Sequence, residues 1–210
     1  MKLIVAPLHE VAGLVSRHQP SHLISLASPG HVDAPLATAP SHRLELRFND
    51  IAEPREHLIS LASPGHVNAP LATAPSHRLD LRFNDIAEPR EGLTPPTEAD
   101  VAALLAFAAS WDGTRPLLIH CWAGVSRSTA AAYVIACALA PPRREAHWAG
   151  RLRSLAPTAT PNPLIVALAD RLLNRDGAMT RAVAAIGRGA ETAWGQAFEL
   201  DLSPEEETRR

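Results

Sequence analysis

The sequence lacks the marks of a secreted or membrane protein. Its 210 residues include two cysteines, Cys121 and Cys137, too few for a disulfide framework and typical of a reducing compartment. No stretch approaches the roughly 18 consecutive apolar residues that a membrane-spanning helix needs. The apolar run at the start is also shorter than the core of a secretory signal. We therefore expect a soluble, cytoplasmic protein with no membrane partner.

Lysine is scarcer still, since Lys2 is the only one and nearly every basic side chain is an arginine. Together with the many alanines and prolines, this bias favours a GC-rich, bacterial genome. The net charge of −2 provides no basic excess for binding a nucleic-acid backbone. The histidines form no HExxH motif and no Cys/His cluster, so the sequence predicts no metal site.

A tandem duplication occupies the first half of the chain. Residues 22–56 and 57–91 are near-identical copies of 35 residues that differ only at Asp33/Asn68 and Glu45/Asp80. Two copies are too few for a solenoid. Each copy reads as a short apolar strand, a Pro/Gly-rich loop and a second, alternating strand. One fold needs this unit once, so we expect the extra copy to be added at a sheet edge, looped out or partly disordered.

The remaining pattern predicts alternating strands and helices. Residues 2–6 and 116–120 read as strands, the second wholly apolar and therefore central in a sheet. Thr97 and Asp100 predict the start of a helix. The expected helices are 8–18, 97–110, 128–139, 143–155, 163–174 and 178–188. We expect an α/β fold with a central, mostly parallel sheet flanked by helices, in a single domain of residues 1–202 with a flexible tail at 203–210.

The most informative segment is the loop between the apolar strand and the next helix, His120-Cys-Trp-Ala-Gly-Val-Ser-Arg-Ser128. Five residues between Cys121 and Arg127 allow the backbone N–H groups to converge on an anion, and the helix N-terminus adds to their field. Gly124 suits a tight turn or a close approach to a ligand. The planar guanidinium of Arg127 matches two phosphate oxygens. The electrostatic field that would bind the phosphate also favours the reactive thiolate of Cys121.

This segment resembles the signature of the protein tyrosine phosphatase superfamily, which is His-Cys, five residues, Arg, then Ser or Thr. The aspartate Asp85 lies 36 residues before Cys121, between a strand and a helix. That order resembles the compact dual-specificity branch, in which an acid loop precedes the phosphate loop. Residues 160–163, Thr-Pro-Asn-Pro, are similar to the Pro-Asn that opens a late helix there. The Trp-Pro-Asp loop and the phosphotyrosine-recognition motif of the larger tyrosine-specific enzymes are absent. Motif support covers roughly residues 78–174.

The resemblance implies the cysteine-dependent phosphatase fold, a reaction that requires no metal or organic cofactor, and a role for each matched residue. Cys121 would attack phosphorus, Asp85 would act as general acid and then base, and Ser128 would assist departure of the sulfur. His120 would brace the loop. The phosphate oxygens would be held by Arg127 and the loop amides, which belong to Trp122, Ala123, Gly124, Val125, Ser126 and Arg127.

Several alternatives stay open at this stage. Asp50 duplicates the context of Asp85 and would supply the acid if the first copy were the one docked. Trp122 either stacks on an aromatic substrate or only packs, Cys137 is expected in the core, and Asn162 is expected to cap a helix. A catalytically impaired phosphate-binding module and a rhodanese-type sulfurtransferase are the competing functions.

The expected substrate is a phosphorylated protein or a small phosphomonoester. The loop contains no lysine, which disfavours highly phosphorylated inositol lipids. Phosphotyrosine is the default, with phosphoserine or phosphothreonine possible if the site is shallow.

Overall fold

The computed structural model describes residues 1–29, 43–45 and 77–203. Within them a six-stranded sheet has the order β3-β4-β2-β5-β1-β6. Five neighbouring strands run parallel, and β6 pairs antiparallel with β1 at one edge. The strands are β1 (Lys2–Pro7), β2 (His22–Ala27), β3 (Arg43–Glu45), β4 (His77–Arg82), β5 (Leu117–Cys121) and β6 (Phe198–Asp201). This arrangement confirms the predicted α/β class with a mostly parallel sheet.

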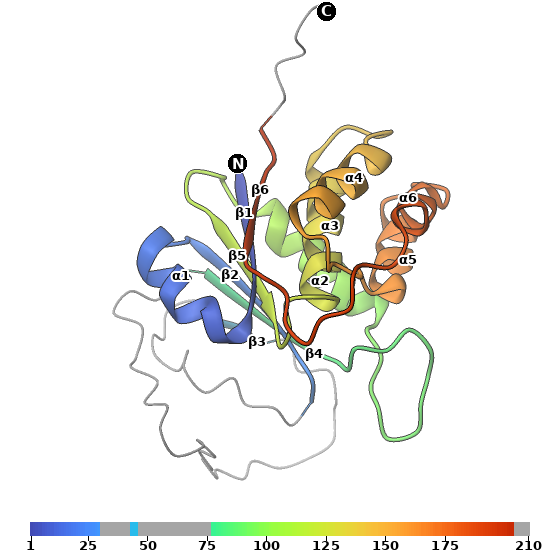
Figure 1. The fold of residues 1–210 in the computed structure, drawn as a ribbon, viewed down its shortest axis with the longest axis horizontal. Helices are drawn as coiled ribbons and strands as arrows, with labels where there is room; N and C mark the ends of the chain where they lie inside the picture. The colour runs from blue at the N-terminus through green and yellow to red at the C-terminus, as the bar shows by residue number, and fades with distance from the viewer. Residues whose placement is uncertain (30–42, 46–76, 204–210) are drawn as a thin grey trace, which may run out of the picture.

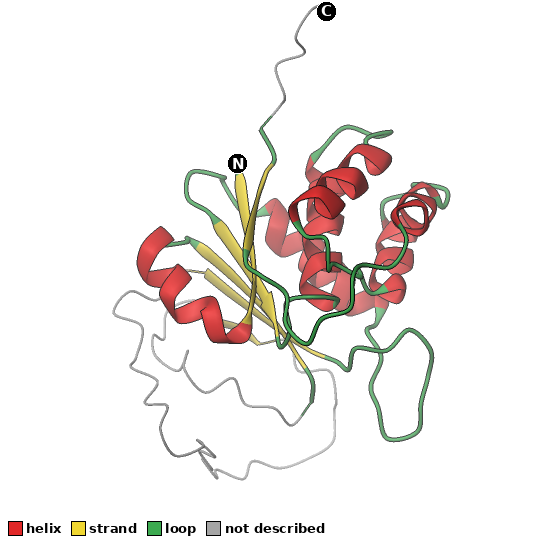
Figure 2. Cartoon of the chain, viewed as in Figure 1, coloured by secondary structure: helices red, strands yellow, loops and turns green. Residues whose placement is uncertain are grey.

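Helices cover both faces of the sheet unequally (Figures 1 and 2). Of the helices in the described ranges, one face carries α1 (Val11–His18) alone, which follows the short 3-10 turn η1 (Leu8–Glu10). The opposite face carries the other described helices, which form one layer (Figure 2). These are α2 (Glu98–Ala109), α3 (Arg127–Leu139), α4 (Glu145–Leu155), α5 (Pro163–Leu172) and α6 (Ala178–Ile186). Most of the helices expected from the sequence are therefore present, with ends displaced by a few residues.

The central strands are apolar because both of their faces are covered. Leu118 of β5 packs toward α1, whereas its neighbours Leu117 and Ile119 belong to the larger cluster beneath the five helices. Helix α3 lies inside that cluster, with eleven of its thirteen residues buried. Since β5 and α3 are both held in the core, the loop between them has two rigid ends.

Two of the described helices, α2 and α5, begin with a side-chain cap. The Thr97 hydroxyl accepts the N–H of Asp100, and the Asp100 carboxylate accepts the N–H of Thr97, so that a capping box opens α2. The side chain of Asn162 accepts the N–H groups of Leu164 and Ile165 and caps α5. Both caps were predicted from the sequence.

The sheet takes strands from both copies of the duplication. Strand β2 belongs to the first copy and β4 to the second, and the two pair in parallel. Strand β3, from the first copy, lies outside β4 with Leu44 opposite Leu79, which is its own counterpart in the repeat. Thus β3 lies at one edge of the sheet. The strand predicted at 57–61, Asp50 and the tail at 204–210 lie outside the described residues.

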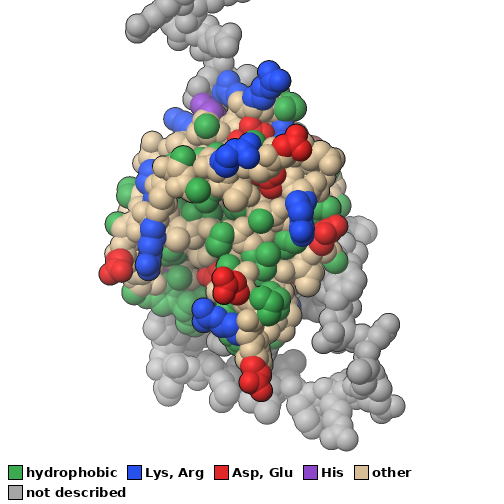
Figure 3. Space-filling model, turned by 90° about the vertical axis from the view of Figure 1, so that its right-hand side faces the viewer, with side chains coloured by type: hydrophobic (Ala, Val, Ile, Leu, Met, Phe, Trp, Pro, Cys, Tyr) green, Lys and Arg blue, Asp and Glu red, His purple; other side chains and the backbone are tan. Residues whose placement is uncertain are grey.

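Two further features complete the description. No helix within the described ranges is long and apolar enough to cross a membrane. On the face drawn in Figure 3, basic and acidic side chains are interspersed among apolar ones.

Candidate active site

The Cys121–Arg127 loop connects the carboxyl end of β5 to the N-terminus of α3. Strand β5 lies between β2 and β1 in the middle of the sheet. Ligands of open α/β sheets bind outside the carboxyl ends of the strands, and a helix N-terminus in that position favours anions. The loop therefore occupies the place in this fold where an anion site is expected.

The sulfur of Cys121 is buried and receives donors from its own loop. The Gly124 N–H donates to Cys121 Sγ over 3.2 Å. The hydroxyl Oγ of Ser128 lies 3.1 Å from the same sulfur, and either atom of that pair can donate. These two contacts hold the sulfur in place at the start of the loop. Cys121 and Ser128 are thus brought together as the sequence predicted.

Gly124 is required by the turn and by the neighbouring strand. Its φ is +72°, in the region that favours glycine. A Cβ at this position would lie 2.7 Å from the backbone nitrogen of Pro7, at the end of β1. The sequence predicted a tight turn or a close approach to a ligand here; the close approach in the structure is to β1.

The loop presents N–H groups that the rest of the described chain does not use. Among the described residues, the backbone N–H groups of Ala123, Val125 and Ser126 have no hydrogen-bond partner. Helix α3 begins without a side-chain cap. These groups are therefore available to an anion, which is the role that the sequence analysis assigned to them.

Arg127 is a buried cation without a carboxylate partner in the described part of the chain. Its side chain is 6% exposed. One terminal nitrogen, Nη1, donates to the Phe83 carbonyl over 3.1 Å and to Ser28 Oγ over 3.2 Å. Its Nε is buried and has no hydrogen-bond partner within the described residues. A buried charge without a counterion is costly, and an anion beside this guanidinium would offset that cost.

His120 is buried and neutral. Its Nε2 lies 2.8 Å from Ser25 Oγ of the neighbouring strand β2. Burial, followed by the nearby positive charge of Arg78, lowers the pKa of His120 to about 4. A neutral imidazole held between β5 and β2 can brace the start of the loop, and proton transfer at neutral pH is not its natural role.

Asp85 reaches the loop from the second copy of the duplication. Its Oδ1 accepts a hydrogen bond from Ser126 Oγ and another from Asn162 Nδ2, both over 2.8 Å. The side chain of Asp85 is exposed. The structure therefore places an accessible carboxylate against the Cys121–Arg127 loop, and this carboxylate comes from the copy that the sequence analysis favoured.

The base of the Asp85 loop is closed by a pair of bonds. The Asn84 N–H donates to the Thr94 carbonyl over 2.7 Å, and the Thr94 N–H donates to Asn84 Oδ1 over 2.8 Å. Since Asn84 directly precedes Asp85, these bonds fix the direction in which the acidic residue leaves β4.

Asn162 has a second contact that the sequence analysis missed. Its Oδ1 caps α5, while its Nδ2 donates to Asp85 and, over 3.3 Å, to the Ile86 carbonyl. The side chain is 3% exposed. The Pro-Asn-Pro segment was the available signal, but the partner of the amide lies 77 residues away and could not be read from local sequence.

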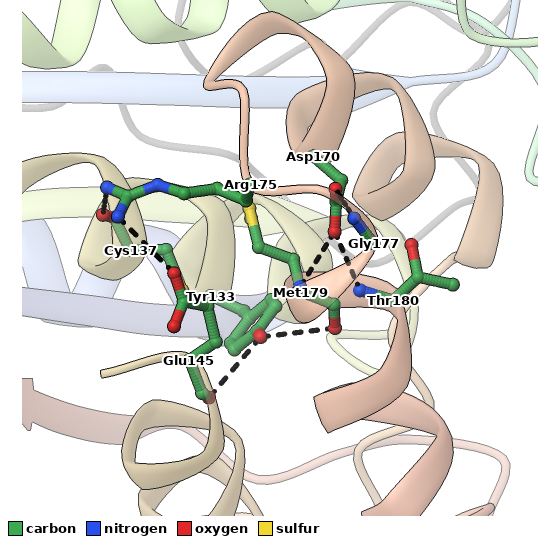
Figure 4. Close-up of polar contacts among 8 residues, drawn as sticks. All are labelled: Tyr133, Cys137, Glu145, Asp170, Arg175, Gly177, Met179 and Thr180. Carbon is green, nitrogen blue, oxygen red and sulfur yellow. Dashed lines mark hydrogen bonds and ion pairs between the residues drawn. The ribbon is translucent and has the colours of Figure 1, made fainter. Parts of the chain in front are cut away.

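Cys137 lies in the core, as predicted. Burial raises its pKa to about 12, so that it remains a thiol at neutral pH. Figure 4 shows it within a polar cluster that joins the helices. There Arg175 donates to the Cys137 carbonyl and forms an ion pair with Glu145 over 3.3 Å, and Tyr133 Oη donates to the carbonyls of Glu145 and Met179. These contacts stabilise the helical layer behind α3.

The same cluster contains an acidic helix cap. Both carboxylate oxygens of Asp170 accept backbone N–H groups at the start of α6, from Gly177, Met179 and Thr180 (Figure 4). Negative charge at a helix N-terminus is stabilising. Asp170 is thereby occupied as a structural cap.

No group of three or more His, Cys, Asp or Glu side chains that could hold a metal ion occurs among the described residues. Comparison with protein-family models, with curated proteins and with solved structures gave no match.

Proposed function

We propose that this chain is a cysteine-dependent phosphomonoester hydrolase of the protein tyrosine phosphatase type. The observation that carries the proposal is the buried Arg127 guanidinium, without a counterion among the described residues, in a loop that also holds the Cys121 sulfur and unused N–H groups. A phosphate monoester dianion supplies the charge that Arg127 lacks and the acceptors that the N–H groups lack.

The first chemical step forms a thiophosphate. The Cys121 thiolate attacks phosphorus, the bond between phosphorus and the leaving oxygen breaks, and protonated Asp85 delivers its proton to that oxygen. The loop amides and Arg127 hold the equatorial oxygens, on which charge is spread in the transition state. A positioned acid of this kind contributes about 10²–10⁴-fold to the rate.

The second step releases phosphate. Asp85, now a carboxylate, removes a proton from a water molecule that attacks phosphorus, and the phosphorus–sulfur bond breaks. The Ser128 hydroxyl donates to the departing sulfur, for which the 3.1 Å contact is suitable. Ser126 and Asn162 act as positioning residues, because both hold the Asp85 carboxylate and neither touches the reacting atoms in this scheme.

The substrate of this proposal carries a single phosphate group. The loop offers one arginine and no lysine, which is too little positive charge for a cluster of phosphates. Phosphotyrosine remains the first choice among phosphorylated proteins.

The test is hydrolysis of a small aryl phosphate by the wild type and by Cys121→Ser, Asp85→Asn and Cys137→Ser. We expect loss of turnover with Cys121→Ser, a reduction of about 10²–10⁴-fold with Asp85→Asn, and near-wild-type turnover with Cys137→Ser, the matched control. Absence of turnover in the wild type, with phosphate still bound, would support the binding module instead. A persulfide on Cys121 would support the sulfurtransferase.

A further inference from the structure

Two of the four tryptophans are exposed beside the Cys121–Arg127 loop. Trp122 directly follows the cysteine and is 51% exposed, and Trp194 is 42% exposed. Their rings are in contact, with centroids 5.6 Å apart. The other two tryptophans, Trp111 and Trp148, are 4% and 6% exposed. Large aromatic rings are normally kept largely out of water, so this exposed pair is unusual within its own chain.

A third ring extends the pair. His9, from η1 after β1, packs edge-on against Trp194 with centroids 5.1 Å apart. The three rings come from the N-terminal part, the loop and the C-terminal part of the chain. We call Trp122, Trp194 and His9 the aromatic cluster.

Trp194 is anchored to the loop by its own segment. Between α6 and β6 the chain passes the carboxyl end of β5 (Figure 1). The Gly195 N–H donates to the Ala123 carbonyl over 2.8 Å. A Cβ on Gly195 would lie 2.8 Å from the Gly124 carbonyl oxygen, so that only glycine permits this approach. The position of Trp194 relative to the loop is thereby set by backbone contacts.

The backbone of Trp194 is also held locally. Thr192 Oγ1 donates to the Trp194 carbonyl over 2.7 Å and accepts the Trp194 N–H over 3.3 Å. The ring is therefore presented by a braced turn. An anchored and exposed ring loses little conformational freedom when it stacks on a ligand.

We propose that the aromatic cluster is a subsite that binds a planar ring attached to the phosphate group of the substrate, with Trp194 as a specificity-determining residue. This proposal rests on the proposed function for the phosphate itself. The loop supplies charge and N–H donors for the anion, whereas the two tryptophans of the cluster supply uncharged ring faces and edges. A monoester of a phenol matches both parts, and a monoester of a simple alcohol matches only the first.

The test measures binding by calorimetry in the Cys121→Ser background, which prevents turnover. The dissociation constants of phenyl phosphate, methyl phosphate and inorganic phosphate are compared between the protein that retains Trp194 and the Trp194→Leu and Trp194→Phe variants. We expect Trp194→Leu to raise the dissociation constant of phenyl phosphate about three- to tenfold, which is the range of an aromatic contact. The dissociation constants of the other two ligands should change less than twofold. Trp194→Phe should retain most of the preference for phenyl phosphate.

The control is Leu155→Ala, another large exposed apolar side chain, on α4. It should leave all three dissociation constants as they are. Equal changes for the three ligands with Trp194→Leu, or no change for phenyl phosphate, would overturn the subsite.

Failure of the subsite and failure of the phosphatase give different results. Hydrolysis by the wild type together with ring-independent binding overturns the subsite alone. Ring-dependent binding without hydrolysis by the wild type overturns the phosphatase alone. If none of the three ligands binds, both proposals are wrong.

Discussion

Replacing Asn162 by alanine should lower both stability and the catalytic rate, because the oxygen and the nitrogen of its side-chain amide have different partners. Its Oδ1 caps α5 through the N–H groups of Leu164 and Ile165. Loss of such a cap costs about 1 kcal/mol, which lowers the melting temperature of a domain of this size by roughly 2–4 °C. Its Nδ2 holds Asp85, and through that bond it bears on catalysis.

The catalytic effect can be bounded from the geometry. Asp85 Oδ1 accepts two hydrogen bonds, and the one from Ser126 Oγ survives in Asn162→Ala. A bond to a charged group contributes about 1.5–3 kcal/mol when buried, and less here because Asp85 is exposed. We expect a loss of about tenfold in kcat. This is smaller than the 10²–10⁴-fold that a placed acid supplies in full.

A comparison of leaving groups makes the effect diagnostic. Phenol leaves less readily than 4-nitrophenol and depends more on protonation by Asp85. Asn162→Ala should therefore slow phenyl phosphate more than 4-nitrophenyl phosphate. Asn162→Ser, which keeps a side chain suited to capping, should recover the melting temperature without recovering the rate on phenyl phosphate. Equal losses on both substrates would refute the reasoning that Asn162 acts through Asp85.

Three further predictions follow from the core and the loop. Gly124→Ala should destabilise the protein by about 1–3 kcal/mol in urea unfolding and weaken phosphate binding, because φ is +72° and the new Cβ would lie 2.7 Å from the Pro7 nitrogen. An unchanged free energy of unfolding and unchanged phosphate binding would contradict the close approach to β1. Because the folded state holds the pKa of His120 at about 4, below its ordinary 6.5, stability should be full above pH 6.5 and should fall by about 3 kcal/mol as the pH drops to 4. Urea unfolding of His120→Gln should lack this part of the pH dependence, and an unaltered slope would count against a buried neutral imidazole. Cys137, whose pKa is raised to about 12 by burial, should react with iodoacetamide only on unfolding, whereas labelling in the folded protein would show that it is accessible.

The sequence predicted what depends on local pattern. The wholly apolar Leu117–Ile119 run identified a covered central strand, and the capping pair Thr97 and Asp100 identified the start of α2. The order strand, Cys121 loop, helix followed from the same reasoning. Each of these features is decided by residues that are close together in the chain.

Other features depend on contacts between distant residues. Strand β6 was not predicted, because four residues with two buried side chains, Phe198 and Leu200, are a weak signal until β1 is beside them. The use of β2 from one copy and β4 from the other could not be deduced, since near-identical copies have equal intrinsic preferences. Long-range contacts also determine the hydrogen bond from Asn162 to Asp85 and the position of Trp194 beside the loop.

The most direct test of the central proposal is to trap the covalent intermediate on Cys121. The wild-type protein is mixed with an aryl phosphate, quenched in acid within one turnover and digested, and the peptide that carries Cys121 is examined by mass spectrometry, with Cys121→Ser and Cys137→Ser treated alike. We predict a mass increase of one phosphoryl group on that peptide in the wild type and in Cys137→Ser, and none in Cys121→Ser. Turnover without any phosphoryl group on Cys121, or with the group on another residue, would contradict the assignment of Cys121 as the nucleophile.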